Sequence, residues 1–299
     1  MDSETLGALR YWKTHRYMPD QIPFVEAVQS LSTLYPDIEL RRSTVRSNEW
    51  VFYRVATDTP AIMTFAGVFS ESDPYETGNF VWRDNEVPIG LDENRVRFAG
   101  YKAAYSYAIE TYDDTEMWEL QQMLEQHVVN VPGFNPSRKA RLEWQNGSTM
   151  HPRFFIRVPM FFPFQGRGPQ SVAPDGLHPW VKAAHARTRG YQANPRKPRV
   201  RAIEGGVVRP IEECTPNKLE YGDVVGLVFT VHYTENDRTW SPIYMMSDII
   251  RVRRANREAY PIAPPPPPDD LPFDNGDFTV SGAPLGKQIS PRSSYRLGR

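Results

Sequence analysis

The feature that most constrains the fold of this chain is a run of β-branched and aromatic residues at positions 224–233. Side chains of this kind favour a pleated, packed strand. Successive residues of a strand point to opposite faces, and here both faces are largely apolar. One face would carry Val225, Leu227, Phe229, Val231 and Tyr233, and the other Val224, Gly226, Val228, Thr230 and His232. We therefore predict a central strand that is buried on both sides.

The flanking residues predict how this strand is connected within the stretch 217–254. A turn precedes it, because Gly222 can adopt a positive φ and Asp223 follows. A polar reversal at 234–238 leads to a second strand at 239–242, where Pro242 favours an edge or a bulge. A third strand is expected at 249–252. A long strand followed by a hairpin is typical of small β-barrels of the OB or SH3 kind.

Helical and extended patterns alternate in the first half of the chain. Apolar residues at helical spacing predict a helix at 24–35, and 6–17 could form a further short helix. Asp113 or Asp114 caps the second predicted helix, which ends near Asn130. Its buried stripe would consist of Met117, Leu120, Leu124 and Val128. Strands are expected at 38–45, 49–56 and 61–69, with shorter β-like runs between 76 and 98.

The pattern changes after residue 135. The apolar run 152–164 predicts a buried strand that breaks at Pro159 or Pro163, and a short helix is expected at 180–187. Residues 187–201 are basic and are interrupted by glycine and proline, so we interpret them as an extended arm. Residues 259–299 lack periodicity and predict a disordered tail.

These elements predict an α+β fold with four parts. Residues 1–135 would form a domain of mainly antiparallel strands with two helices, and 136–201 a basic, proline-rich connecting region with a buried strand and a short helix. Residues 202–257 would form a small β-barrel-like unit of the OB or SH3 kind, and 258–299 the tail.

The charge of the chain is unevenly distributed. The net charge is −1, yet residues 144–203 contain 10 Lys and Arg against one acid, Asp175. Residues 1–143 contain 14 Lys and Arg against 22 Asp and Glu. Arginine is the cation best suited to bidentate phosphate contacts and to stacking on rings. The basic segment therefore indicates a partner that carries phosphate groups, or else internal pairing with the acidic first half.

We expect a non-enzymatic binding protein, with single-stranded DNA or RNA as the first candidate partner. The cations and one ring of the arm, together with the end of the last strand, would contact the nucleic acid. These candidate residues are Arg187, Arg189, Tyr191, Arg196, Lys197, Arg199, Arg201, Arg251, Arg253 and Arg254. If these side chains pair with acids of 1–143, they join two parts of the chain instead.

A proline run offers an alternative function. Pro264, Pro265, Pro266, Pro267 and Pro268 can form a polyproline II segment, which proline-binding domains recognise. The β unit and this segment would then act as a protein-interaction scaffold. A linker would have the same composition without any partner.

The sequence lacks the common signatures of catalysis and metal binding. We find no nucleophile elbow, phosphate-binding loop or dinucleotide fingerprint, and the six histidines show no ligand spacing. We expect no cofactor and no metal, and an enzyme with a dispersed site is a second alternative. A single cysteine, Cys214, and the absence of a signal or membrane segment predict a nuclear or cytoplasmic protein.

One segment resembles a known group of proteins. The pattern L-E-Y-G-D-V-V-x-x-x-F-x-V from Leu219, followed by W-S-P from Trp240 and I-I-R-V from Ile249, resembles the C-terminal part of uncharacterised, multi-copy proteins of mushroom-forming fungi. The resemblance implies a fungal, intracellular protein associated with transposable elements, and it slightly favours a role connected with DNA. It assigns no activity and no functional residue.

Overall fold

The computed structural model describes residues 1–44, 46, 48–80, 103–142, 153–163, 178–187, 190–194 and 197–256. The predicted α+β class is confirmed, because these residues form four α-helices and a large, mainly antiparallel sheet. Several predictions lie outside the described residues. They concern Arg189, Arg196, the β-like runs beyond residue 80, the tail and the proline run Pro264, Pro265, Pro266, Pro267 and Pro268.

β13 (Val224–Glu235) is a central strand, as its sequence predicts, but Thr230 and His232 are only half-buried, so it is not buried on both sides along its whole length. It pairs antiparallel with β14 (Thr239–Arg253) on one side and with β5 (Met63–Ser72) and β3 (Glu49–Arg54) on the other. β14 is one strand of 15 residues, although two short strands were expected in its place. The ladder with β13 continues past Pro242. On the other side of β14, β7 pairs with 239–240 and β11 with 248–251, so no strand pairs with Pro242 there. The N–H that Pro242 lacks therefore removes no hydrogen bond to β7 or β11, as expected for a proline at an edge position.

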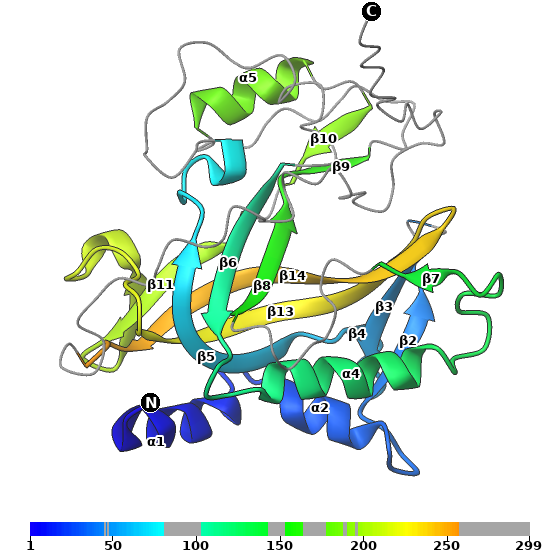
Figure 1. Cartoon of the computed structure of the whole chain (residues 1–299), viewed down its shortest axis with the longest axis horizontal. Helices are drawn as coiled ribbons and strands as arrows, with labels where there is room; N and C mark the ends of the chain where they lie inside the picture. Colours follow the sequence, from blue (N-terminus) through cyan, green and yellow to red (C-terminus); the bar gives the residue numbers. More distant parts are fainter. Residues whose placement is uncertain are drawn as a thin grey trace, which may run out of the picture.

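Five strands enclose the main core as a partly open barrel (Figure 1). Starting from β14 and β13, the ladder continues through β5 and β6 (Ala104–Glu110) to β8 (Arg153–Pro159). β14 then returns against β8, where the rings of Phe154 and Tyr244 lie 5.4 Å apart. The barrel therefore combines strands from the N-terminal, connecting and C-terminal parts that were predicted separately.

The remaining strands extend this sheet or form a small second one. At one end of the β13–β14 hairpin the sheet includes β2 (Ile38–Arg42), β4 (Thr59–Pro60) and β7 (Ala140–Arg141). At the other end are β11 (Arg199–Glu204) and β12 (Val207–Pro210), while β1 (Ile22–Pro23) pairs with β5. β9 (Phe161–Pro163) and β10 (Tyr191–Ala193) form the second sheet.

The helices lie outside the barrel, and three of them line one side of the molecule (Figure 1). These are α1 (Ser3–Lys13), α2 (Phe24–Ser30) and α4 (Glu116–Val128), whereas α5 (Pro179–Arg187) lies near the second sheet. Two single 3₁₀ turns, η1 (Gly78–Phe80) and η2 (Ile211–Glu213), complete the described elements.

The predicted apolar stripe of α4 is buried, as its spacing requires. The cap of α4 differs in detail from the prediction. Thr115 occupies the cap position, and Asp114 accepts a 3.4 Å hydrogen bond from the backbone N–H of Glu116. Asp114 and Glu116 also bind Lys13 of α1, at 2.7 and 2.6 Å. These acids therefore join two helices in addition to favouring the start of one.

Candidate nucleic-acid interface

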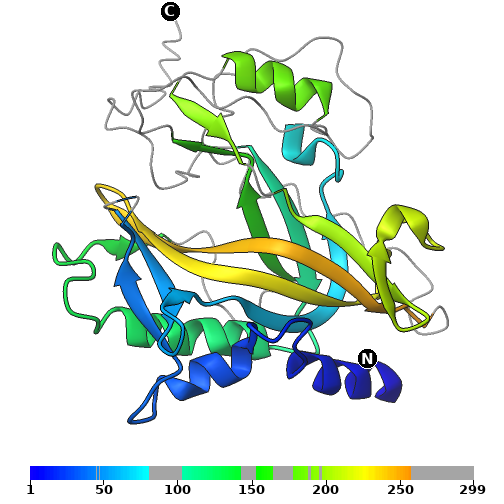
Figure 2. The ribbon, with the colours of Figure 1, turned by 180° about the vertical axis from the view of Figure 1, so that it is seen from behind.

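Strand alternation defines one side of the β13–β14 hairpin that is directed away from the main core. Phe229, Val231 and Tyr233 belong to the core, so the residues between them point outward. The ladder places outward residues of β14 beside them. We call this surface the hairpin outer face, and it consists of Thr230, His232, Ile243, Met245 and Asp248. The first four are half-buried and Asp248 is buried. In Figure 2 the hairpin crosses the molecule from β2 and β3 at one end to β11 at the other.

Two of the predicted arginines extend the hairpin outer face onto β11. Val200 and Ala202 of β11 are buried in the core, so Arg199 and Arg201 point outward. Both contact Asp248: Nη2 of Arg199 lies 2.8 Å from Oδ2, and Nε of Arg201 lies 3.3 Å from Oδ1. The Arg199 side chain is 60% exposed. One buried carboxylate thus faces two guanidinium groups on this part of the face.

Lys197, the next predicted cation, is half-buried among tyrosines. Its Nζ lies 3.6 Å from the centroid of the Tyr75 ring and 5.6 Å from that of Tyr105, a cation–π arrangement. Glu76 lies 3.6 Å from the same nitrogen. Burial lowers the pKa of Lys197, and the charge of Glu76 opposes this effect. The side chain therefore holds the arm against the barrel, and Glu76 is an acid of the first half of the chain.

Arg251 has an internal, structural position. Its side chain is only 2% exposed and donates hydrogen bonds to the carbonyl oxygens of Pro216 and Lys218, at 2.8 and 2.9 Å. Glu204 lies 3.5 Å from Arg251 and 3.5 Å from Arg254. A guanidinium that satisfies buried carbonyl groups in this way cannot also contact a phosphate, so Arg251 is unsuited to the role predicted for it.

The other predicted residues are dispersed over the surface. Arg253 forms an ion pair with Glu4 of α1. Arg187 is exposed at the end of α5, while Tyr191 is buried in β10, where it pairs in register with Pro163. The described part of the basic arm thus brings only Arg199 and Arg201 onto the hairpin outer face.

The opposite end of the hairpin outer face contains a polar relay. His232 Nδ1 lies 2.9 Å from Oε1 of Glu49, and Nε2 lies 2.8 Å from the Thr230 hydroxyl oxygen. Arg46 also reaches Glu49, at 3.5 Å. Burial acts to raise the pKa of Glu49, but the hydrogen bond and charge of His232 and the charge of Arg46 outweigh it and lower the pKa overall. Bonded at both nitrogens, the imidazole is held in a fixed orientation on the strand.

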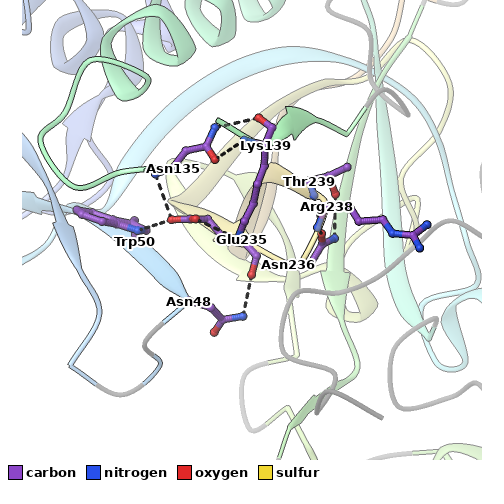
Figure 3. A network of polar contacts seen from close by, with 8 residues as sticks. All are labelled: Asn48, Trp50, Asn135, Lys139, Glu235, Asn236, Arg238 and Thr239. Carbon is purple, nitrogen blue, oxygen red and sulfur yellow. Dashed lines mark hydrogen bonds and ion pairs between the residues drawn. The ribbon is translucent and has the colours of Figure 1, made fainter. Parts of the chain in front are cut away.

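Beyond this relay the hairpin ends in a buried polar network around Glu235 (Figure 3). The Glu235 carboxylate accepts hydrogen bonds from the indole N–H of Trp50, at 3.0 Å, and the backbone N–H of Asn135, at 3.4 Å. Nζ of Lys139 lies 3.5 Å from it. The backbone of Glu235 exchanges two hydrogen bonds with Asn48, at 2.8 and 3.1 Å. This carboxylate therefore joins three separate segments at the end of the hairpin.

A second strand face also carries arginines, but acids outnumber them. Arg153 of β8 lies 3.1 Å from Glu71, and Glu110 of β6 is its register partner. Burial lowers the pKa of Arg157 to about 10, while the charge of Asp73 acts to raise it. Three carboxylates thus accompany two guanidinium groups. This face is consequently less suited to a polyanion than the hairpin outer face.

Sequence reasoning missed several residues of the hairpin outer face. His232 was predicted only as a strand residue, because alternation does not reveal which face of a strand the rest of the chain covers. Ile243 and Met245 fall between the two strands predicted at 239–242 and 249–252. A signal was present at Thr230 and His232, the two polar positions of an otherwise apolar run. Polar residues two apart on one face of a strand indicate solvent on that side.

The described residues contain no group of three or more His, Cys, Asp or Glu side chains that could hold a metal ion. In the same part of the chain, no helix is long and apolar enough to cross a membrane.

No family model and no curated protein matches the chain. Among solved structures, it is similar to a C-terminally truncated single-stranded DNA-binding protein from bacteriophage Enc34, with 10% identity and a TM-score of 0.33, over 73% of this chain and 97% of that one. The same phage protein in complex with ssDNA gives 10% identity and a TM-score of 0.32, over the same shares. The gp2.5 single-stranded DNA-binding protein encoded by bacteriophage T7 gives 11% identity and a TM-score of 0.31, over 68% and 98%. These values assign the chain to no family.

Proposed function

We propose that the chain binds single-stranded nucleic acid along the hairpin outer face. The observation that carries this proposal is the position of Arg199 and Arg201, which share one outward strand face with the half-buried side chains of His232, Ile243 and Met245. Cations that contact the phosphates, next to flat or apolar groups that contact the bases, are what a sequence-tolerant single-strand site needs.

The chemistry of each group supports this arrangement. A guanidinium offers a planar fork of donors that matches a phosphate, so Arg199 can exchange its contact with Asp248 for one with the backbone of the ligand. The Arg199 side chain is 60% exposed and Arg201 also contacts Asp248, so the buried carboxylate keeps one cation when Arg199 turns to the ligand. The fixed ring of His232 and the flexible side chain of Met245 can pack against bases. Affinity would then depend strongly on salt and weakly on sequence.

The test is fluorescence anisotropy of the purified full chain with labelled 16-nucleotide DNA and RNA strands and with duplexes, at ~50 and ~200 mM salt. We expect single strands to bind more tightly than duplexes and to dissociate as salt rises. Replacing both Arg199 and Arg201 by glutamine should lower the slope of log K against log salt by about 1.4, at roughly 0.7 per cation for single strands.

A matched control is Arg209→Gln, which removes an exposed cation from the edge strand β12. This variant should retain wild-type affinity. Met245→Glu adds a negative charge to the face without breaking an ion pair and should weaken binding, with thermal unfolding used to verify that it folds. The proposal fails if the wild-type chain binds none of the strands at ~50 mM salt, or if Arg209→Gln weakens binding as much as the double variant.

A further inference from the structure

The far end of the hairpin is a rigid, built surface. We call it the hairpin tip, and it consists of the loop 134–139 and the turn 236–238. Glu235, which immediately precedes the turn, holds the loop to it through the backbone N–H of Asn135 and the ammonium group of Lys139. The Asn236 side chain closes its own turn by accepting hydrogen bonds from the backbone N–H groups of Arg238 and Thr239, at 2.8 and 2.6 Å.

The loop 134–139 adopts a backbone conformation that ordinary side chains avoid. Asn135 has a φ of 43° and Arg138 a φ of 50°. Such residues persist only where their surroundings hold them. Phe134 anchors the loop between the rings of Trp50 and Trp240, whose centroids lie 5.7 and 5.6 Å away. The Asn135 side chain also bridges the loop to the backbone of Lys139, at 2.8 and 2.9 Å.

Two arginines project from this rigid frame. Arg138 and Arg238 are both exposed, and no ion pair is found for either among the described residues, in contrast to most arginines of the fold. The parallel pairing of Thr239 with Ala140 brings their two turns side by side. In Figure 3 the Arg238 side chain points away from the Glu235 network.

The acids at this end of the molecule do not neutralise these arginines. Glu235 is buried and accepts from Trp50, Asn135 and Lys139, so its charge is matched inside the network. Asp237, in the turn 236–238, is the exposed acid of the tip. Arg138, Lys139 and Arg238 therefore stand against Glu235 and Asp237, and two arginines and one aspartate face solvent.

We propose that the hairpin tip is a second phosphate-binding point for the same nucleic-acid strand, a proposal that rests on the function proposed above. Thr239 and Asp248 are nine residues apart on β14, which at about 3.4 Å per residue places the tip roughly 30 Å from the Arg199 end. A nucleic-acid strand bound at both ends must extend along the hairpin. A short oligonucleotide can bind either at the tip or at the Arg199 end, whereas a longer one can bind at both.

The test compares labelled DNA strands of 4 and 16 nucleotides, a range of site sizes known for single-strand-binding barrels. The double variant Arg138→Gln, Arg238→Gln should bind the longer strand at least threefold more weakly and lower its salt slope by about 1.4. Its affinity for the shorter strand should change less, because that strand can still bind at Arg199 and Arg201.

A matched control removes two exposed cations from other elements, with Arg10→Gln on α1 and Lys182→Gln on α5. Arg138→Asn is a second variant that suits the left-handed backbone and separates charge from strain. If the wild type binds no strand, the proposed function fails. If it binds and both tip variants retain its affinity and length dependence, or if the control loses as much, the tip proposal alone is overturned.

Discussion

Glu49 is the residue whose surroundings bear most directly on the stability of the proposed face. Its carboxylate is largely buried, yet it binds His232 and Arg46. The pKa of Glu49 in the folded chain is consequently lower than its ordinary value of 4.5. The ionised carboxylate thus stabilises the folded state above the pKa of the unfolded chain, and this contribution is lost as pH falls through the folded-state pKa.

We therefore expect Glu49→Gln to lower the free energy of unfolding at pH 7 by about 1–3 kcal/mol, because it weakens two charged contacts at a buried site. The difference between wild type and variant should shrink as pH falls below 4.5, where the carboxylate of the unfolded chain becomes protonated. Urea unfolding of both proteins at several pH values measures this. A difference that stays constant down to pH ~3 contradicts the assignment.

At the scale of elements, the contact between β13 and the segment after α1 determines which part of the sheet is covered. Gly226 lies on the outward side of β13, and a Cβ built there would lie 1.7 Å from Oη of Tyr17. Next to it, Leu9 of α1 packs against Ala66, Val68 and Val224. The glycine permits this close approach, and α1 covers the hairpin near Val224.

We expect Gly226→Ala to destabilise the fold by about 1–3 kcal/mol, the usual cost of overfilling a packed site. Gly7→Ala is the matched control, because a Cβ at Gly7, in α1, meets nothing within 4 Å. That substitution should stabilise the protein by about 0.5–1 kcal/mol, since alanine is the better helix former. Thermal unfolding measures the change in stability caused by each substitution. Equal changes would show that the Tyr17 side chain moves away from Gly226 without cost.

At the scale of the whole molecule, one sheet joins parts of the chain that are distant in sequence. β13 pairs with β5, which is more than 150 residues away, and β11 joins the far edge of β14. The segment 202–257 contains β12, β13 and β14 but lacks the strands β5, β6 and β8 that complete the barrel. Without those strands, the core side of the β13–β14 hairpin lacks most of the apolar cluster that it packs against.

The excised segment 202–257 should therefore not fold by itself, and the full chain should lose the sheet in one transition. Circular dichroism of the segment and hydrogen exchange of the full chain test this. Cooperative unfolding of the isolated segment would show instead that it is an independent unit, as its sequence alone suggests.

The sequence by itself determined which residues form strands and helices where one pattern dominates. The run of β-branched and aromatic residues in β13 and the helical spacing in α4 are local properties, and the structure confirms a strand and a helix there. The position of Arg199 and Arg201 on one face also follows from their spacing of two. Pattern could not show that 239–253 is one strand, because its register is imposed by β13.

Only the tertiary structure decided what the charges do. A count of arginines treats Arg251 and Arg238 alike, yet one satisfies buried carbonyl groups and the other points away from its neighbours at a turn. Pairing depends on which distant acid the fold brings near each cation, and Coulomb attraction decays with distance in space rather than along the chain. The proposed sites are therefore those cations whose charge the folded chain leaves in excess.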